Sequence, residues 1–269
     1  MTTVRAIETM AGDDPITMLT AYDAPTAALV DAAGVDLILV GDSMGNAALG
    51  YDSTLPVTVE EVRSRTAAVA RATSDAVVVA DMPFLSVGVD EAQSIDHCGR
   101  MLKEADADAV KLECGPHTVE LTKRLVELGV PVMAHLGLTP QQVKQTGYLR
   151  QGTSKAEAQE ILDLARAHEE AGAFSVVLEH VPANLAAQVT EELAIPTVGI
   201  GAGPDCDGQV LVVNDVVGLG DSVPPFAKQF GDVQSAMMEA IGSYVEAVES
   251  GTFPAEEHSH VEPDLDELY

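Results

Sequence analysis

Polar side chains that could hold a metal ion or move a proton recur along this sequence, each at or just after the end of a short apolar run. Carboxylates, an ammonium group and an imidazole in one place could together bind a cation, neutralise an anionic substrate and accept a proton. The residues at these positions are Asp42, Ser43, Asp81, Lys111, Glu113, His135 and Glu179. Whether they can act together depends on the elements that carry them.

The stretch from residue 37 to residue 58, LILVGDSMGNAALGYDSTLPVT, shows the pattern most clearly. It opens with four apolar residues between turn residues, which is typical of a strand buried on both faces. The apolar run ends at Gly41, and Asp42 and Ser43 follow where the strand leaves the core. We interpret Asp42 as a metal ligand at the mouth of a barrel.

Apolar runs of strand length alternate with helical patterns along the chain. The predicted strands span residues 16–20, 37–40, 77–82, 109–112, 131–136, 174–178, 196–200 and, with the weakest pattern, 210–213. The predicted helices span residues 24–33, 58–73, 118–128, 154–171, 184–193 and 232–250, and a further helix starts after Asp90. This alternation predicts βαβ units around a parallel sheet. Seven or eight units favour one closed (βα)8 barrel, a fold of about 250 residues, over an open sheet. We assign residues 1–255 to this barrel and residues 256–269 to an acidic tail.

The carboxyl ends of barrel strands converge on one mouth, where enzymes of this fold place their active sites. Asp42, Asp81 and Glu113 would form an all-oxygen site there, which suits Mg2+ and could accept Mn2+. The alternative is that these acids only cap the following helices. No cluster of histidines or thiolates competes in the sequence, so zinc is disfavoured. Lys111 would either pair with these carboxylates or neutralise an anionic substrate, most simply a carboxylate held beside the metal.

Glu179 follows the mostly apolar sequence FSVVL at 174–178 and precedes His180, so it stands where a buried strand ends. A carboxylate in this position could act as a general base, or it could form a salt bridge with a neighbouring strand. The glycine-rich residues 199–203 lack the spacing of a dinucleotide-binding loop, and we interpret them as a tight turn lining the mouth.

The sequence is strongly acidic, because 14 Lys and Arg residues oppose 43 Asp and Glu residues and give a formal net charge of -29. Such a surface repels nucleic acids and anionic membranes, so we expect neither as a partner. The acidic residues are spread along the whole chain, and high salt would screen their mutual repulsion. A halophilic cytoplasm is the simplest explanation of this charge.

The cysteines Cys98, Cys114 and Cys206 are far apart and form no C-x-x-C pair, so neither a disulfide framework nor a zinc site is expected. The first residues lack the apolar segment of a signal peptide, and no run approaches the roughly eighteen apolar residues of a membrane span. These features predict a cytoplasmic protein.

Six blocks of sequence follow one another along the chain. They are V-G-D-S at 40–43, G-Y-D-S-T-L-P-V-T at 50–58, A-D-M-P-F at 80–84, V-K-L-E at 110–113, A-H-L-G-L-T-P-Q at 134–141 and G-I-G-A-G at 199–203. Together they resemble the ketopantoate hydroxymethyltransferase (3-methyl-2-oxobutanoate hydroxymethyltransferase) family. The resemblance covers nearly the whole chain, and several long blocks in the right order make it specific.

The resemblance implies a (βα)8 barrel of the phosphoenolpyruvate/pyruvate type. It also implies transfer of a one-carbon unit from 5,10-methylenetetrahydrofolate to 3-methyl-2-oxobutanoate, which gives 2-dehydropantoate for pantothenate and coenzyme A biosynthesis. The family's Mg2+ positions match Asp42, Asp81 and Glu113, and its proton acceptor matches Glu179. Its keto-acid contacts match Asp42, Ser43, Asp81 and Lys111. His135 stands in a family block as an additional candidate, and the resemblance further implies a homo-oligomer, a homodecamer.

The implied chemistry needs these groups, because the hydrogen on C3 of an α-keto acid is too weakly acidic to leave unaided at neutral pH. A Mg2+ ion chelated by the keto oxygen and the carboxylate would stabilise an enolate by several kcal/mol. Glu179 would remove the C3 proton, and the enolate would attack the methylene carbon of the folate.

Two alternatives stay open at this point. A Mg2+-dependent C–C lyase or aldolase of the same barrel superfamily would also form an enolate, but it would not consume methylenetetrahydrofolate together with 3-methyl-2-oxobutanoate. A catalytically silent barrel that only binds or assembles partners has no reason to place an acidic residue at the end of strand after strand.

Overall fold

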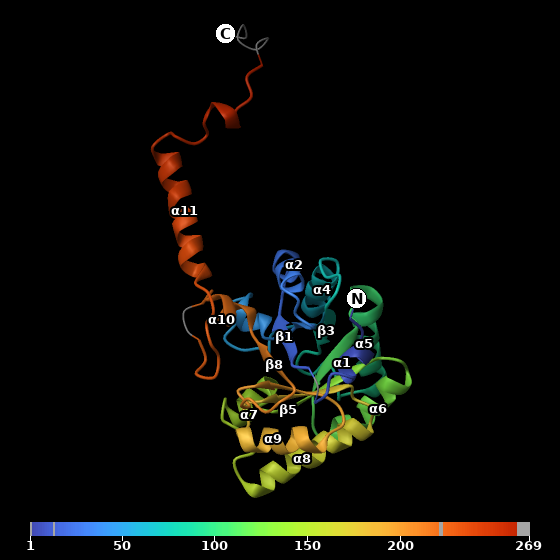
Figure 1. Ribbon diagram of the computed structural model, residues 1–269. Helices are drawn as coiled ribbons and strands as arrows, with labels where there is room; N and C mark the ends of the chain where they lie inside the picture. Colours follow the sequence, from blue (N-terminus) through green and yellow to red (C-terminus); the bar gives the residue numbers. More distant parts are fainter. Residues whose placement is uncertain (1, 13, 221–222, 263–269) are drawn as a thin grey trace. The chain divides into compact units, whose positions relative to one another are not determined.

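The eight predicted strands form one closed barrel of parallel strands in a computed structural model that describes residues 2–12, 14–220 and 223–262 (Figure 1). The strands are β1 (Ile16–Thr20), β2 (Leu37–Val40), β3 (Val77–Asp81), β4 (Ala109–Glu113), β5 (Val132–Gly137), β6 (Ser175–Glu179), β7 (Thr197–Ile200) and β8 (Gly208–Leu211). Each strand pairs with the next along the chain, and β8 closes the barrel against β1. The predicted barrel is confirmed.

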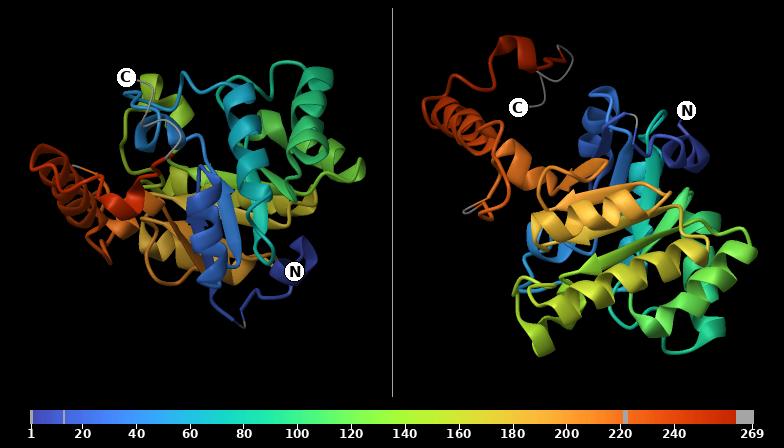
Figure 2. Two further views of the ribbon diagram at one scale, coloured as in Figure 1. Left: turned by 90° about the horizontal axis from the view of Figure 1, so that it is seen from above. Right: turned by 60° about the horizontal axis from the view of Figure 1, so that its bottom comes forward.

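The long helices that follow the first six strands lie outside the barrel (Figure 2). The α-helices of the described residues, long and short together, are α1 (Val4–Glu8), α2 (Ala24–Ala32), α3 (Met44–Ala47), α4 (Val59–Ala70), α5 (Glu91–Ala105), α6 (Val119–Glu127), α7 (Val143–Thr146), α8 (Lys155–Glu170), α9 (Ala183–Glu192), α10 (Val213–Val217) and α11 (Val233–Glu249). A capping box of Thr58 and Glu61 opens α4, and one of Ser154 and Glu157 opens α8. Each box satisfies backbone N–H groups that no helical turn reaches, so it fixes where the helix begins.

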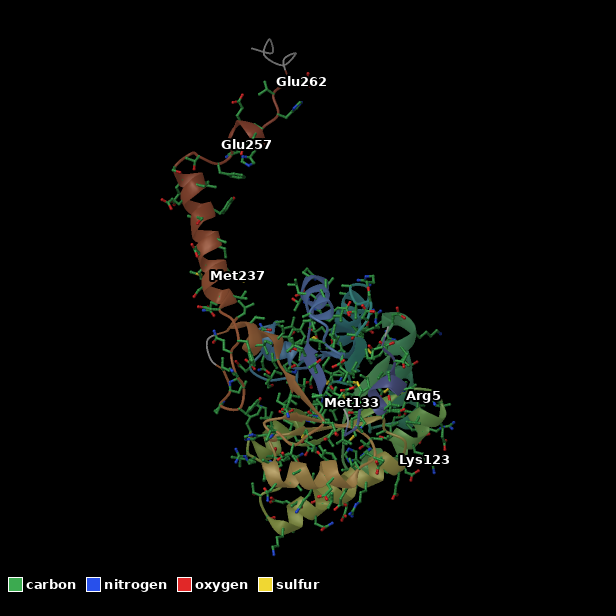
Figure 3. The ribbon with its side chains drawn as sticks, viewed as in Figure 1. Arg5, Lys123, Met133, Met237, Glu257 and Glu262 are labelled. Atoms are coloured by element: carbon green, nitrogen blue, oxygen red, sulfur yellow. The ribbon has the colours of Figure 1, made fainter. Side chains whose placement is uncertain are left out.

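Side chains inside the barrel change from apolar to polar along the strand direction. Successive residues of a strand point to opposite faces, so every second residue faces the interior. Toward the amino ends of the strands the interior holds apolar residues such as Leu37, Val79 and Met133, which are fully buried. Figure 3 labels Met133 among the strands of the barrel. Two residues beyond this layer stand Asp81 on β3 and His135 on β5, which are also buried. The apolar layer therefore forms the floor on which the polar residues of the mouth rest.

The eighth strand lies two residues earlier than its apolar pattern predicts. We expected residues 210–213, but β8 begins at Gly208, and Val213 already belongs to α10. Gly208 pairs with Ile16 of β1, and a Cβ on Gly208 would lie 2.6 Å from the Ile16 carbonyl oxygen. The close approach of the two backbones requires a glycine there, and glycine carries no apolar signal for a strand.

Contacts between residues divide the chain into two compact units. The first comprises Met1–Val213 with Pro224–Ala227 and contains the barrel, and the second comprises Asn214–Val223 with Lys228–Tyr269 and contains α11. The predicted boundary between residues 255 and 256 stays a prediction, and residues 263–269 of the predicted acidic tail lie outside the described residues. Among the helices of the described ranges, none combines the length and hydrophobicity that a membrane span requires.

A histidine outside the mouth joins two helices of the barrel wall. His168 of α8 is fully buried, and its Nδ1 lies 3.0 Å from the hydroxyl of Thr122 on α6. Burial lowers the pKa of His168 to about 4 from its ordinary value of 6.5. The folded chain therefore holds this histidine in its neutral form at neutral pH.

We expect His168 to make the barrel less stable in mild acid. The unfolded chain takes up a proton near pH 6.5 and the folded chain only near pH 4, so the stabilisation is complete above pH 6.5 and is lost as the pH falls toward 4. The shift corresponds to at most about 3 kcal/mol. His168→Asn keeps a partner for Thr122 but cannot titrate, so its free energy of unfolding should fall less between pH 7 and pH 4.5. Denaturant titrations at fixed salt measure this, and equal losses in both proteins would contradict it.

Candidate active site

A buried ion pair stands at the centre of the mouth. Asp81 of β3 and Lys111 of β4 are paired across the two strands, so their side chains point to the same side. The Lys111 ammonium nitrogen lies 2.9 Å from Oδ1 of Asp81. Only 5% of Lys111 and 2% of Asp81 are exposed to solvent. Burial alone would lower the pKa of Lys111, but the neighbouring carboxylates raise it, so the lysine stays charged.

Asp42 lies against this pair at the end of β2. Its backbone N–H donates to Oδ2 of Asp81 over 3.2 Å, and the residue is 5% exposed. Burial raises the pKa of Asp42 to about 7, with a further contribution from the nearby charge of Asp81. Two carboxyl groups held this close in a buried place cannot both ionise freely unless a cation compensates them.

Gln141 connects the predicted ligands, although the sequence did not single it out as a site residue. It belongs to the 3-10 helix η2 (Pro140–Gln142) that follows β5. Its side-chain amide donates to Oδ2 of Asp42 and to the Met82 carbonyl oxygen, both over 2.9 Å, and its backbone N–H donates to Oε1 of Glu113 over 3.1 Å. The sequence did offer one indication that Gln141 belongs to the site, because it is the last residue of the block A-H-L-G-L-T-P-Q at 134–141.

One carboxylate oxygen of Glu113 accepts no hydrogen bond from the described residues. Its Oε2 is buried and has no hydrogen-bond partner among the described residues. Burial raises the pKa of Glu113 to about 9, and the charge of Asp42 adds to the shift. A buried carboxylate oxygen without a donor is costly, so a cation at this position would be favourable.

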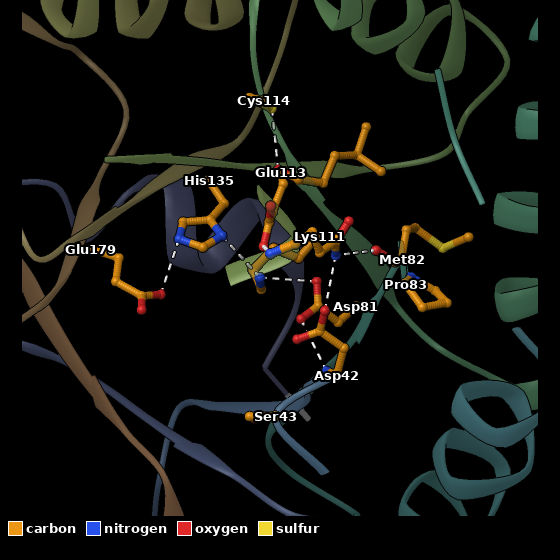
Figure 4. Close-up of polar contacts among 12 residues, drawn as sticks. Asp42, Ser43, Asp81, Met82, Pro83, Lys111, Glu113, Cys114, His135 and Glu179 are labelled. Carbon is orange, nitrogen blue, oxygen red and sulfur yellow. Dashed lines mark hydrogen bonds and ion pairs between the residues drawn. The ribbon is translucent and has the colours of Figure 1, made fainter. Parts of the chain in front are cut away.

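His135 lies between the ion pair and the predicted base (Figure 4). Its Nδ1 is 3.3 Å from the ammonium nitrogen of Lys111, and its Nε2 is 3.1 Å from Oε2 of Glu179. Burial lowers the pKa of His135, and the adjacent charge of Lys111 lowers it further. The side chains of Asp81, Lys111, His135 and Glu179 therefore form one continuous polar row across the mouth.

The backbone around Glu179 is tightly constrained. Gly137 of β5 pairs with Glu179, and a Cβ on Gly137 would collide with the Glu179 carbonyl oxygen. Leu138 donates its backbone N–H to that same oxygen over 2.8 Å. His180 then turns the chain through the left-handed region, with φ of 49°. Strand β6 therefore ends abruptly after Glu179, whose side chain remains 18% exposed at the mouth.

Ser43 is placed at the edge of the cluster. Its hydroxyl lies 2.9 Å from the hydroxyl of Tyr22, and a Cβ on Gly41 would come within 2.7 Å of that Ser43 oxygen. The glycine therefore leaves room for the serine to turn toward β1. The structure thus gathers the other predicted site residues into one network and positions Ser43 beside it through Tyr22.

The carboxyl oxygens of Asp42, Asp81 and Glu113 are the kind of ligand that a hard divalent cation prefers. One ammonium group stands among three carboxyl groups, two of which have raised pKa values because they are buried near one another. Within the described ranges, however, no three acidic, histidine or cysteine side chains already converge on one point that could hold a metal. Mg2+ commonly binds through one or two carboxylates, with water and substrate completing its shell. The residues present therefore fit this ion without a complete protein cage.

Removing the ammonium group should destabilise the barrel. Lys111→Met would leave Asp81 buried without its partner, and breaking one side of a buried ion pair costs about 3–5 kcal/mol. Denaturant titration at fixed pH and salt measures this loss in the free energy of unfolding. Replacing both partners, Lys111→Met with Asp81→Asn, should cost less than the sum of the two single changes, and strict additivity would contradict a direct interaction.

The comparison with known sequences gives one consistent result. The model of the ketopantoate hydroxymethyltransferase family matches residues 1–256. A protein of Natronomonas pharaonis named 3-methyl-2-oxobutanoate hydroxymethyltransferase is 70% identical over 263 residues, covering 98% of each chain. Proteins of the same name from Haloarcula marismortui and Geobacter metallireducens are 68% and 49% identical, and this chain covers 100% and 94% of them respectively.

Solved structures with low sequence identity share the fold. A phosphoenolpyruvate phosphomutase from Streptomyces platensis subsp. rosaceus aligns with a TM-score of 0.63 at 15% identity, over 96% of this chain and 92% of that one. A 2,3-dimethylmalate lyase, described as a member of the PEP mutase/isocitrate lyase superfamily, aligns with a TM-score of 0.58 at 15% identity, over 98% and 93%. These structures therefore share the predicted (βα)8 barrel fold with this chain. By its match over nearly all of its length and by its close relatives, the chain belongs to the ketopantoate hydroxymethyltransferase family of enzymes.

Proposed function

We propose that this enzyme transfers a hydroxymethyl group from 5,10-methylenetetrahydrofolate to 3-methyl-2-oxobutanoate and forms 2-dehydropantoate for pantothenate and coenzyme A biosynthesis. The names of the close relatives support the keto acid and the type of transfer. The structural observation that best supports this chemistry is the polar row at the mouth, in which the carboxylate of Glu179 and the buried ammonium group of Lys111 lie on either side of His135.

The ammonium group of Lys111 is suited to the carboxylate of the keto acid. It is the one cationic group that contacts this cluster in the described part of the chain, and it stays charged although it is buried. In the proposal, Lys111 and Ser43 hold the carboxylate end of the substrate, with Asp42 and Asp81 lining the same place. Orienting the two substrates in one site contributes a large entropic part of the rate enhancement.

The proposed cofactor is Mg2+, or Mn2+ in its place, held by Asp42, Asp81 and Glu113. The support is the unused buried oxygen of Glu113 and the raised pKa values of Glu113 and Asp42, which burial and mutual repulsion cause. When bound, such an ion acts as a Lewis acid toward a keto oxygen and is worth several kcal/mol as negative charge develops there.

Glu179 is the proposed general base. Its carboxylate takes the proton from C3, and the electrons of the broken C–H bond become the double bond of the enolate. The enolate carbon then forms a bond to the methylene carbon of the folate as one of that carbon's two bonds to nitrogen breaks. Water supplies the hydroxyl group to the same carbon as its second bond to nitrogen breaks. The two nitrogens of the released tetrahydrofolate take up the proton removed from C3 and the remaining proton of the water. Glu179 suits the first step because it ends β6 at the mouth, with its side chain partly open to solvent.

Exchange of the C3 hydrogen with deuterated water tests the base and the cation without the folate. The wild-type enzyme with Mg2+ should exchange it, and removal of the ion by a chelator should abolish the exchange. Glu179→Gln should still bind the keto acid but exchange about 10²- to 10⁴-fold more slowly, because the amide cannot accept the proton. Undiminished exchange by this variant would assign the base elsewhere.

A second measurement separates the transferase from a lyase or aldolase of the same superfamily. The proposed enzyme consumes 5,10-methylenetetrahydrofolate and 3-methyl-2-oxobutanoate in equal amounts, whereas a lyase would leave the pair untouched. If the keto acid exchanges its hydrogen but the folate is not consumed, the base assignment stands and the proposed donor is wrong.

We also propose that the chain acts in the cytoplasm at high salt, as a homo-oligomer and specifically a homodecamer. Its formal net charge of -29 supports a salt-screened environment. The support for assembly is α11, whose residues Met237, Ile241, Tyr244 and Val248 are between 46% and 59% exposed. Their spacing of four, three and four residues places them along one face of the helix, as in helices that pack against a partner helix.

A second copy of the chain is the expected partner of this face, because an apolar stripe of this length is seldom left in water. Ile241→Glu should therefore lower the mass of the assembly, measured by light scattering during gel filtration at high salt. Ser243→Glu adds the same charge on another face of α11 and should leave the mass unchanged. An unchanged assembly in the Ile241 variant would contradict a role for this face.

A further inference from the structure

His135 lies at the only place in the described network where the ion pair and the proposed base meet. It is 2% exposed, and each of its ring nitrogens faces one charged side chain. Nδ1 faces the ammonium group of Lys111 and Nε2 faces the carboxylate of Glu179. Neither the family match nor the names of the relatives give this histidine a role.

The partners of the two nitrogens fix the tautomer of the ring. A lysine ammonium group has three N–H donors and no acceptor, so the nitrogen that faces Lys111 must offer a lone pair. The single proton of a neutral imidazole is then on Nε2, where it points toward the side of Glu179. Burial and the positive charge of Lys111 both favour the neutral ring.

The contact reaches only one oxygen of the base. Nε2 is 3.1 Å from Oε2 of Glu179, and among the described residues no side chain other than His135 forms an ion pair with this carboxylate. The N–H direction is not aligned well enough with Oε2 to count as a full hydrogen bond in this arrangement. Catalytic hydrogen bonds are often poorly aligned before substrate binds and become shorter in the complex.

We infer that His135 is a positioning residue for the base: with its proton on Nε2, it holds Oε2 of Glu179 and leaves Oε1 free to take the substrate proton. The inference rests on the proposed function, in which Glu179 removes the C3 proton. The same ring accepts from Lys111 through Nδ1, so the orientation of the base is tied to the group that is proposed to hold the substrate carboxylate. His135 itself does not gain or lose a proton in the step.

Two substitutions separate this role from simple packing. In His135→Gln the amide can reach the position of Nε2 and donate to Glu179, whereas in His135→Asn it reaches only the position of Nδ1 beside Lys111. The test compares the C3 exchange rate of 3-methyl-2-oxobutanoate in deuterated water at saturating substrate. The Asn variant should exchange about 10- to 100-fold more slowly, as is typical when a group that orients an active-site residue is lost. The Gln variant should recover most of the wild-type rate, and the substrate concentration for half-maximal exchange should change little in either.

His168→Asn provides the matched control, because it alters another buried histidine that has no contact with the row. Its exchange rate should equal that of the wild type. Equal losses in the Gln and Asn variants, or no loss in the Asn variant, would overturn the inference. If the wild-type enzyme shows no exchange at all, the proposed function fails, and this inference fails with it. If the wild type exchanges but the two variants do not differ as expected, only this inference fails.

A measurement on the unaltered enzyme removes any dependence on how the variants fold. Neutron diffraction from crystals in deuterated buffer locates the proton on the ring directly. Deuterium on Nε2 alone, facing Glu179, is the expected result. Deuterium on Nδ1, or on both nitrogens, would overturn the inference.

Discussion

The buried ammonium group of Lys111 is the interaction on which the rest of the mouth depends. It contacts Asp81 directly, and the charges of Asp42 and Glu113 act on it at longer range. Without it, buried carboxyl groups would face one another with nothing to compensate them. Together with burial, the same charge lowers the pKa of His135, and the ammonium group faces Nδ1 of that ring. One lysine therefore organises both the proposed metal side of the mouth and the proposed base side.

The barrel supplies the constraint that brings these groups together. Pairing between parallel strands sets Asp81 beside Lys111, and Glu113 beside His135, before any side chain makes a contact. The alternation of side chains then sends them inward, above a floor of aliphatic residues. Because register and alternation both follow from backbone hydrogen bonds, the positions of these charges are as rigid as the barrel itself.

Sequence alone predicted the parts of this arrangement that local patterns encode. Buried strands of a parallel sheet have continuous apolar runs, so most strands and the residues at their ends, such as Asp42 and Glu179, could be located. Strand β8 shows the limit of this approach. It begins at Gly208, which packs closely against β1, but a glycine adds nothing to an apolar run, so the start of the strand could not be predicted.

Contacts between distant loops were beyond the reach of those patterns. The bond from Gln141 to Asp42 spans 99 positions and depends on how η2 folds back over the mouth. The contact of Ser43 with Tyr22 likewise depends on the path of the chain after Gly41. The apolar stripe of α11 has the spacing of any core-facing helix, so its exposure could not be read from sequence.

The central claim is that the carboxylates around Lys111 hold a divalent cation within reach of a keto acid whose C3 faces Glu179. The most direct test is a crystal structure with 3-methyl-2-oxobutanoate and Mn2+, in which anomalous scattering locates the ion. The account predicts one ion bound to carboxylate oxygens among Asp42, Asp81 and Glu113, with C3 of the keto acid next to Oε1 of Glu179. An ion bound outside this group, or a keto acid with C3 turned away from Glu179, would contradict it.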